Sequence, residues 1–367
     1  MLVSAHANDQ LRAAVRERHL PCPEYLRLEE RYGIELLDWA RLGAGPTKRS
    51  AGLSLSHARA ALPLLGGRDA VFSDGEHVGV PLALAMLLRG VCTPHLMLGH
   101  HLTTRAKRPV FRLLKPQRRI SRLLVHSNRQ LELAVSELAI PRQRLAFVAY
   151  GVDTAFWSPA PVHEERLVVS VGKEHRDYAT LARACGDLPI RVFVAAGSLF
   201  SPVAAQRQPR EWPSNFQVSF AEPSAVRDMY ARAAVVVVPL VPTDFQAGVT
   251  VVLEAMAMAK TVVVTATEGH ADVVEDGVTG LMVPPGDAAA LREAVTRLLA
   301  NPSERRRLGA NARQAVVARF GLDQYADRLA WHLEQICHPA IGIGGATSRL
   351  SRPDRDDHPM TMRGGRP

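Results

Sequence analysis

Short runs of apolar and often β-branched residues recur along the chain, and longer stretches with helical spacing separate them. This alternation is typical of α/β proteins built on parallel sheets. The runs form two comparable sets, so the sequence predicts two doubly wound domains. The expected strands of the first set are residues 1–5, 34–39, 70–74, 95–100, 123–127 and 145–150. Those of the second set are residues 167–171, 191–196, 216–220, 234–240, 261–267 and 280–283.

The two sets are separated by the segment FWSPAPVH, residues 156–163. Its two prolines disfavour both a helix and a central strand, which is typical of a linker. We therefore expect an N-terminal domain over residues 1–158 and a second domain over residues 159–325. The amphipathic pattern of residues 322–336 predicts a C-terminal helix, placed as a segment of its own at 326–340. The Gly-, Pro-, Ser- and Arg-rich residues 341–367 are expected to be disordered.

Composition limits the class of protein. The 367 residues are 47% hydrophobic, which is enough for a sizeable core in each domain. No run reaches the ~20 apolar residues of a membrane-spanning helix, and the N-terminus lacks a signal-peptide pattern. We expect a cytoplasmic protein, with the inner face of the membrane as an alternative location. The four cysteines lie far apart, which argues against disulfides and zinc knuckles, and no metal or cofactor is expected.

One junction between a loop and a helix carries most of the chemical information. Gly248 lacks a Cβ, so the backbone there can approach a ligand closely. The free N–H groups of residues 249–251 and the helix dipole would then favour a diphosphate, although most helix starts bind nothing. Glu254 is the one charged residue in this apolar helix, and a buried carboxylate needs a partner. A salt bridge and a pair of sugar hydroxyls both satisfy that requirement.

The run QAGVTVVLEAMAMAKTVVVT, followed by DVVEDGVTGLMVPPGD, resembles the donor-binding core of family 4 glycosyltransferases. The segments YGVDTAFWSP and VSVGKEHRDYATL are also similar to motifs of that family, and the resemblance covers roughly residues 121–320. It implies the GT-B fold, in which two Rossmann-like domains face each other across a cleft. It further implies transfer of a hexose from a UDP- or GDP-linked donor to an acceptor hydroxyl, with retention of configuration and without a metal.

The resemblance assigns roles by position. Glu254 matches the second glutamate of the family's E-x7-E pair, which binds the nucleotide ribose. Gln246 stands at the first glutamate, where it keeps hydrogen-bonding capacity for the donor sugar but cannot ionise; we count it as a catalytic and a donor-binding candidate. Lys173 and Arg176 match basic residues near the diphosphate. The remaining donor-binding candidates are Gly197, Ala247, Gly248, Val249 and Thr250.

The acceptor side is less well determined by the sequence. Family members commonly carry a glycine-rich loop after the first strand, whereas this chain reads SAHANDQ there. His100 and His101 follow an expected strand at a place where related enzymes have a histidine facing the donor sugar, so both are catalytic candidates. Glu76 and His77 follow another strand and are acceptor-side candidates. The acceptor itself is not identified, and a glycan and a lipid-linked sugar are both compatible with the sequence.

The strong positive charge of the chain favours anionic partners, because its formal net charge is +9. Residues 105–122 are the most basic segment. It could contact an anionic membrane or a phosphorylated acceptor, or it could be a solvated helix face. With one aromatic residue, Phe111, and no known reading motif, it is not expected to bind nucleic acid. Its basic residues are Arg105, Lys107, Arg108, Arg112, Lys115, Arg118, Arg119 and Arg122.

Two alternative functions remain compatible with the same residues. An epimerase of this fold would act on the nucleotide-sugar without any acceptor. A non-catalytic protein would bind a nucleotide-sugar and leave it intact, and Gln246 and the missing glycine loop favour this second alternative.

Overall fold

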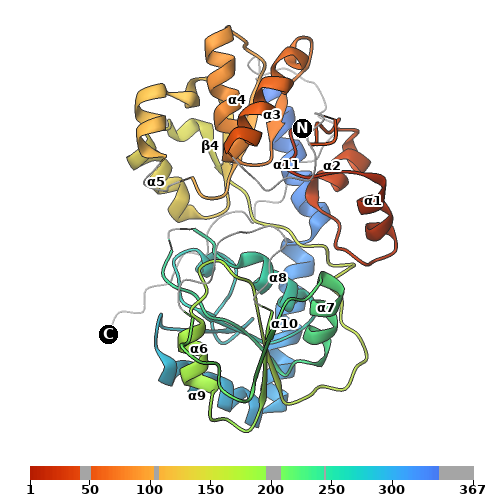
Figure 1. Cartoon of the computed structure of the whole chain (residues 1–367), viewed down its shortest axis with the longest axis vertical. Helices are drawn as coiled ribbons and strands as arrows, with labels where there is room; N and C mark the ends of the chain where they lie inside the picture. The colour runs from red at the N-terminus through yellow and green to blue at the C-terminus, as the bar shows by residue number, and fades with distance from the viewer. Residues whose placement is uncertain (42–50, 103–106, 196–207, 244, 339–367) are drawn as a thin grey trace. The chain divides into compact units, whose positions relative to one another are not determined.

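The structure is a computed structural model that describes residues 1–41, 51–102, 107–195, 208–243 and 245–338, except for the side chains of 51–53 and 271. The chain forms two compact units (Figure 1). Unit 1 comprises Met1–Ala13, Pro23–Ala149 and Asp323–Pro367, and unit 2 comprises Ala14–Cys22 and Tyr150–Leu322. Helix α1 (Asp9–Arg16) runs from the first unit into the second.

Unit 1 is built on a four-stranded parallel sheet in the order β1-β2-β3-β4. Its strands are β1 (Val71–Ser73), β2 (His95–Gly99), β3 (Arg122–Val125) and β4 (Leu145–Phe147). Its helices are α2 (Glu24–Tyr32), α3 (Ala51–Ala61), η1 (Leu62–Leu65), α4 (Glu76–Arg89), η2 (Val110–Leu114), η3 (Pro116–Arg119), α5 (Asn128–Leu138), η4 (Arg142–Arg144) and α11 (Leu322–Cys337). The residues of β1 and β2 are all buried, as expected for parallel strands covered on both faces.

The two strands expected at residues 1–5 and 34–39 do not form as strands. Leu2 makes isolated parallel bridges to Leu37 and to Ser73, so both segments lie extended beside β1. The N–H group of Leu2 donates to the carbonyl of Phe72 at 2.7 Å. The apolar pattern therefore predicted the place of these segments but overestimated the length of regular pairing.

Unit 2 is built on a six-stranded parallel sheet in the order β10-β9-β8-β5-β6-β7. Its strands are β5 (Leu167–Val171), β6 (Arg191–Ala195), β7 (Phe216–Ser219), β8 (Val235–Val238), β9 (Val262–Thr265) and β10 (Leu281–Val283). All six expected strands of this half are confirmed within one or two residues at each end. Numbered from β5 as the first strand, the order is 3-2-1-4-5-6, the usual order of the dinucleotide-binding doubly wound fold.

Helices cover both faces of this second sheet. Those of unit 2 are α6 (Tyr178–Cys185), α7 (Pro223–Arg232), α8 (Val249–Ala257), η5 (His270–Asp272), α9 (Ala288–Ala300) and α10 (Pro302–Arg319). Helix α6 packs against α9, and α8 packs against α10 (Figure 1). The core between sheet and helices is rich in aliphatic residues, including Val192, Val235 and Leu298.

Several helices begin at a polar N-cap residue whose side chain accepts a backbone hydrogen bond. Asp177 caps α6 by accepting a hydrogen bond from the Thr180 N–H at 3.1 Å, and Asn301 caps α10 by accepting from the Glu304 N–H at 3.1 Å. Such caps satisfy backbone donors that the helix itself leaves unpaired. The helix expected at residues 322–336 is present as α11. None of the helices in the described part of the chain combines the length and apolar character that a bilayer crossing requires.

Candidate functional site

The sheet of unit 2 has a switch point where strand order reverses. Strand β5 pairs with β6 on one side and with β8 on the other. The chain continues from β5 to β6 on one side of the β5–β8 pair and from β8 to β9 on the other, so the switch point lies between β5 and β8. In doubly wound folds, ligands bind beyond the carboxyl ends of the strands at this point. Two loops meet there, residues 172–177 after β5 and residues 239–248 after β8. The N–H group of Val241 donates to the carbonyl of His175 at 3.0 Å and joins them.

Arg176 lies at the centre of this loop pair. Its side chain is almost fully buried, with 3% exposed. The Nε atom donates to the Val171 carbonyl and Nη1 donates to the Glu174 carbonyl, both at 2.9 Å. It forms no ion pair with any residue that the structure describes, and burial lowers its pKa. A buried charge without an ionic partner is costly, so this position favours an anion from outside the chain.

Two glycines allow the Arg176 guanidinium to occupy its place. A Cβ atom on Gly172 would lie 2.3 Å from Nη2 of Arg176, and one on Gly248 would lie 2.8 Å from Nη1. Both glycines have positive φ values, +106° and +73°, which other residues adopt only with strain. The hydroxyl of Tyr178 donates to the Gly172 carbonyl at 2.5 Å and holds the first loop. Any larger residue at either glycine would displace the guanidinium.

Helix α8 begins at the same place and presents its amino end. Gly248 is its N-cap and supplies no capping side chain. Within the described residues, the N–H groups of Thr250 and Val251 have no hydrogen-bond acceptor. Lys173, in the loop after β5, is half-buried and forms no ion pair with described residues. The helix dipole, Arg176 and Lys173 together make this end of the sheet electropositive.

Glu254, one turn further along α8, is the acidic residue of the site. It is half-buried, and burial raises the pKa of its carboxyl group to about 8, although Arg176 and the nearby Tyr230 act to lower it. Tyr230 is fully buried, and burial together with Glu254 raises its own pKa well above 10.0. The carboxyl group is therefore largely protonated near neutral pH in this state. It does not supply the full countercharge that Arg176 needs.

Gln246 is buried, with 8% exposed, at the end of the loop before α8. Its Nε2 atom donates to the Gly269 carbonyl at 2.9 Å. A glutamate could not donate to that carbonyl unless it were protonated, so the departure from the family motif matches the local hydrogen bonding. The Oε1 atom has no partner among the described residues and could accept a hydrogen bond from a ligand hydroxyl.

His270 supports this loop and escaped the sequence analysis. It is fully buried, and its Nε2 atom lies 2.7 Å from the carbonyl of Ala247, to which it donates. Burial lowers the pKa of His270 to about 4, so the ring stays neutral. The sequence offered no signal beyond its position in the loop EGHADVVEDG, because the contact joins residues 23 apart. Ala247, a donor-binding candidate, is thus held through its carbonyl.

Unit 1 gathers the acceptor-side and histidine candidates at the carboxyl ends of β1 and β2. The buried Glu76 carboxylate accepts from the N–H groups of His100 and His101, at 2.9 and 3.2 Å, and from Lys107 Nζ at 2.6 Å. Burial alone would raise the pKa of Glu76, but Lys107, His100 and these hydrogen bonds hold it well below its usual range. Glu76 is therefore occupied within the chain, where it positions the histidine loop.

The rings of His77 and His100 also form hydrogen bonds in this cluster. His77 Nε2 lies 2.6 Å from the Ser4 hydroxyl, and His100 Nε2 lies 2.7 Å from the Asp74 carbonyl. Gly75 separates the two rings, because a Cβ there would lie 2.7 Å from His77 and 3.3 Å from His100. Ser4 is tied to the Asp74 carboxylate by its N–H group at 2.6 Å. The structure thus brings the predicted histidines together with Ser4, the first residue of the segment SAHANDQ, and adds Asp74, which the sequence had not indicated.

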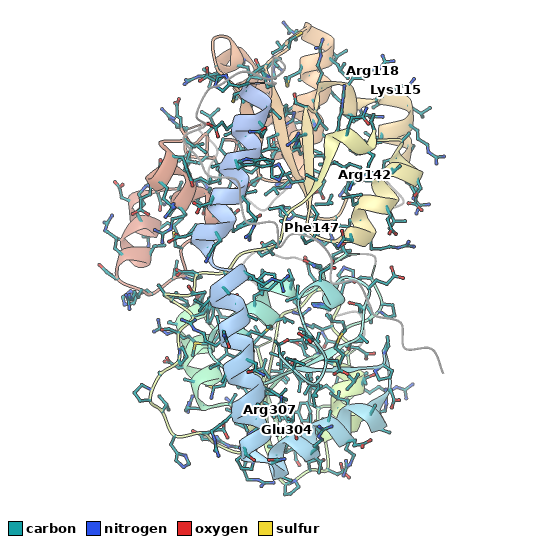
Figure 2. All side chains as sticks on the ribbon, turned by 180° about the vertical axis from the view of Figure 1, so that it is seen from behind. Lys115, Arg118, Arg142, Phe147, Glu304 and Arg307 are labelled. Carbon is teal, nitrogen blue, oxygen red and sulfur yellow. The ribbon has the colours of Figure 1, made fainter. Side chains whose placement is uncertain are left out.

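The remaining candidates divide into two groups. Gly197 and Arg105 lie outside the described residues. Within the basic segment, Lys107 pairs with Glu76, Arg108 pairs with Glu137 at 2.6 Å, and Arg122 donates to His332 Nδ1 at 3.2 Å. These three are engaged within unit 1. The exposed basic residues of the segment are Arg112, Lys115 and Arg118, and Figure 2 labels the last two.

Comparison with protein families places a known domain in unit 2. Residues 153–315 match the family model described as "Glycosyl transferases group 1". The matched range contains both loops of the switch point, helix α8 and all six strands of the unit 2 sheet.

Two curated relatives align with different lengths of the chain. Alpha-D-kanosaminyltransferase of Streptomyces kanamyceticus is 34% identical over 91 residues, which are 25% of this chain and 24% of that protein. Alpha-maltose-1-phosphate synthase of Mycolicibacterium smegmatis is 26% identical over 326 residues, with 77% of this chain and 84% of that protein covered. The chain thus spans about a quarter of the first relative and most of the second.

A solved structure of similar fold is that of Anabaena Alr3699/HepE in complex with UDP-glucose. It superposes with a TM-score of 0.63 at 15% sequence identity and covers 91% of this chain and 98% of that chain. Together with the two parallel-sheet α/β units, this likeness shows that the fold is of the GT-B type.

Proposed function

We propose that this chain, whose unit 2 carries a glycosyl transferases group 1 domain, is a glycosyltransferase that uses a nucleoside-diphosphate sugar. The observation that carries the proposal is the buried guanidinium of Arg176 at the amino end of α8, which has no ion-pair partner among the described residues. It lies at the switch point of a doubly wound sheet, where nucleotides bind in this architecture. A diphosphate there would provide the countercharge that the described residues lack.

The donor roles follow from the chemistry of each group. The N–H groups at the start of α8 bind the diphosphate, and Arg176 and Lys173 stabilise the negative charge that develops as it leaves. Glu254 binds the hydroxyls of the ribose, and the unpartnered Oε1 atom of Gln246 accepts from a hydroxyl of the donor sugar. These cationic groups would do the work that a metal ion does in other transferases. Gly197 stays a donor-side candidate by resemblance alone.

The reaction breaks the bond between the anomeric carbon and the diphosphate and forms one to the acceptor oxygen, which gives up its proton. Family 4 membership and retention of configuration are part of the proposal and rest on the motif resemblance. Both curated relatives are named for α-configured sugars, which agrees with a retaining enzyme acting on an α-linked donor. The UDP-glucose complex of the structural neighbour favours a uridine donor over a guanosine one.

On the acceptor side, the histidine candidates keep their proposed roles and that of Glu76 changes. We keep His100 and His101 as catalytic candidates and His77 as an acceptor-side candidate. Glu76 acts as a positioning residue, because its carboxylate is fully used by the histidine loop and Lys107. The product name of one relative, maltose 1-phosphate, suggests that phosphorylated acceptors be tested beside glycans.

We also propose that the exposed part of the basic segment contacts an anionic membrane surface. Leu113 and Leu114 are 77% and 56% exposed, and they are flanked by the exposed Arg112 and Lys115. Exposed leucines beside basic residues suit an interface where apolar groups enter the acyl boundary and cations contact lipid headgroups.

The test of the donor site is a thermal-shift titration of the wild type with UDP, GDP, ADP and their common sugar conjugates. A nucleotide at 100 times its Kd should add about 2.7 kcal/mol to stability. Glu254→Ala should weaken its binding roughly 10- to 100-fold, because hydrogen bonds to a charged or buried carboxyl group are lost. The matched control is Glu293→Ala, an exposed glutamate of α9. If no nucleotide stabilises the folded wild type, the donor-site proposal fails.

Product analysis with the nucleotide-sugar that binds separates the alternatives. A transferase joins the sugar to an added acceptor, and an epimerase changes the sugar without one. A binding protein leaves the nucleotide-sugar intact under all conditions.

A further inference from the structure

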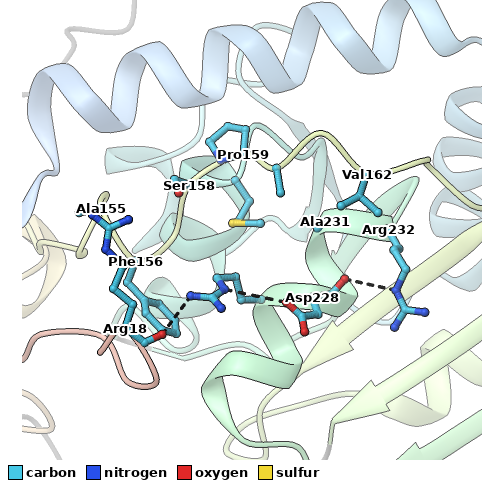
Figure 3. A pocket seen from close by; sticks show the side chains of 12 residues that line it. Arg18, Ala155, Phe156, Ser158, Pro159, Val162, Asp228, Ala231 and Arg232 are labelled. Carbon is cyan, nitrogen blue, oxygen red and sulfur yellow. Dashed lines mark hydrogen bonds and ion pairs between the residues drawn. The ribbon is translucent and has the colours of Figure 1, made fainter. Parts of the chain in front are cut away.

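A pocket lies in unit 2, away from the switch point. Its volume is about 500 Å³, and its walls come from residues 155–162, helix α7 and Arg18 of the 14–22 segment (Figure 3). Met258, the C-cap of α8, also lines it, whereas Gly248 begins that helix at the other end. Nine helical residues span about 14 Å, so the pocket and the diphosphate site are at opposite ends of α8.

Positive charge dominates the lining. Arg18, Arg227 and Arg232 face one carboxylate, that of Asp228. Arg18 is exposed and forms no ion pair with any described residue. Arg227 Nε and Asp228 Oδ1 are 4.0 Å apart, and Arg232 Nη1 lies 3.6 Å from Glu165. Even with these weak pairs, the lining keeps at least one guanidinium without a counterion.

The side chain of Arg227 is held in place by contacts of its own. Arg227 Nη1 donates to the Arg18 carbonyl at 3.2 Å, and its guanidinium lies 4.6 Å from the centre of the Phe156 ring. The N–H group of Cys22 donates to Asp153 Oδ2 at 2.9 Å, which anchors the segment that carries Arg18. Arg18 itself has a φ of +58°, a strained value for a residue with a side chain. The guanidinium of Arg227 is thus positioned before any ligand binds, and the backbone that carries Arg18 is anchored beside it.

The rest of the lining is largely apolar. Pro159 and Val162 are exposed apolar residues of the wall, with Val162 47% exposed, whereas Phe156 and Ala231 are 2% and 6% exposed. Ligand sites commonly combine such apolar walls with a few fixed polar groups. A free inorganic anion would use the guanidinium groups but leave the apolar wall in water.

We propose that this pocket binds a small organic anion, in which a phosphate or carboxylate group meets Arg18 and Arg227 and an apolar or aromatic body contacts Pro159 and Val162. The ligand is distinct from the nucleotide-sugar, and its site does not depend on the proposed donor site. Both ends of such a molecule are required: the charge sets its orientation, and the apolar body adds buried area.

Isothermal titration calorimetry with phenyl phosphate, inorganic phosphate and phenol tests the proposal on the full chain. Phenyl phosphate should bind most tightly, because the other two probes each lack one of its halves. Arg18→Gln should weaken its binding about two- to fivefold, as expected for one exposed charge, and Asp228→Asn should strengthen it. These opposite effects distinguish charge recognition from a general loss of folding.

Two control variants complete the design. Arg306→Gln removes an exposed arginine of α10 outside the pocket and should leave the affinity for phenyl phosphate unchanged. Arg176→Ala should also leave it unchanged, which would show that the probe is not bound at the diphosphate site. The proposal is overturned if the wild type binds phenyl phosphate more weakly than about 10 mM. It is equally overturned if Arg18→Gln and Arg306→Gln behave alike.

Discussion

Arg176 owes its position to two residues that have no side chain. Gly172 and Gly248 come from loops after different strands, and both leave the space that the guanidinium fills. Glycine is required at both positions because the backbone there approaches a charged group more closely than a Cβ atom would permit. Gln246 follows a similar logic, because its amide donates to the Gly269 carbonyl, which an ionised glutamate could not do.

Gly248→Ala should therefore have two separable effects. The positive φ of +73° makes the alanine strained, which costs about 1–2 kcal/mol of stability. The new Cβ would also lie 2.8 Å from Arg176 Nη1, so the guanidinium must move and nucleotide affinity should fall at least about tenfold. Chemical denaturation and nucleotide titration of the same preparation measure the two effects.

Gly277→Ala is the matched control for this prediction. Gly277 has the same φ of +73°, but a Cβ there would meet nothing within 4 Å. It should lose a similar amount of stability and keep wild-type nucleotide affinity. Equal nucleotide affinities for the two variants would show that the place of Arg176 is unimportant for binding.

At the scale of elements, the basic segment divides between two uses. Lys107 and Arg108 are paired with carboxylates inside unit 1, whereas the short helix η2 and the residues after it expose leucines and cations together. Lys115 has a φ of +53°, so the chain turns sharply immediately after Leu114. Some cations of the basic segment therefore pair with carboxylates within unit 1, and others are exposed at its surface.

Removing either component of this surface should reduce membrane binding. We expect the wild type to sediment with vesicles of phosphatidylcholine and phosphatidylglycerol, and less with phosphatidylcholine alone. The double variant Lys115→Gln, Arg118→Gln should lower the partition coefficient for anionic vesicles by about 30-fold, since two basic residues near the surface contribute about 1 kcal/mol each. The double variant Leu113→Ser, Leu114→Ser should lower it through loss of apolar contact.

The comparison for the leucine variant is Leu55→Ser with Leu64→Ser, two leucines of α3 and η1 that are 61% and 44% exposed. This pair should bind vesicles like the wild type. If both leucine pairs reduce sedimentation equally, the effect is one of general apolarity and the assignment of η2 as the contact is wrong.

For the whole molecule, buried histidines set a dependence of stability on acid. Burial lowers the pKa of His95 and His270 to about 4 and of His126 and His332 to about 3. In the unfolded chain these groups bind protons near pH 6.5. Between these values the unfolded state binds more protons, so stability is fully present above pH 6.5 and is lost as the pH falls towards 4. Glu254, with its raised pKa, acts in the opposite direction.

The free energy of unfolding should accordingly fall between pH 6.5 and pH 4.5, by at most about 1.4 kcal/mol per pH unit for each such histidine. His126→Gln should show a shallower fall than the wild type in urea denaturation across this range. His19→Gln, at a histidine whose side chain is 70% exposed, should follow the wild type. A slope for His126→Gln as steep as that of the wild type would contradict the prediction.

Most elements of unit 2 and the chemical types of the proposed site were predictable from the amino-acid pattern alone. Apolar runs predicted every strand of unit 2, because parallel strands buried on both faces must be apolar throughout; only the edge strand β7 is largely exposed among them. The glycine before an apolar helix and the single glutamate within it identified α8 as the helix of interest. Both are local properties, since they depend on residues a few positions apart.

Which side chains contact one another became clear only from the three-dimensional fold. The contact of Arg176 with Gly248 joins residues from two loops, and that of Glu76 with Lys107 joins residues 31 apart. The hydrogen bond of His270 to Ala247 and the pocket near Arg18 likewise bring together residues that are distant in the sequence. Segments 1–5 and 34–39 are a further case, because backbone hydrogen bonds such as that from the Val3 N–H to the Leu37 carbonyl at 3.0 Å join them, although neither forms a regular strand. Contacts between distant segments follow from packing and register, which periodicity in the sequence does not encode.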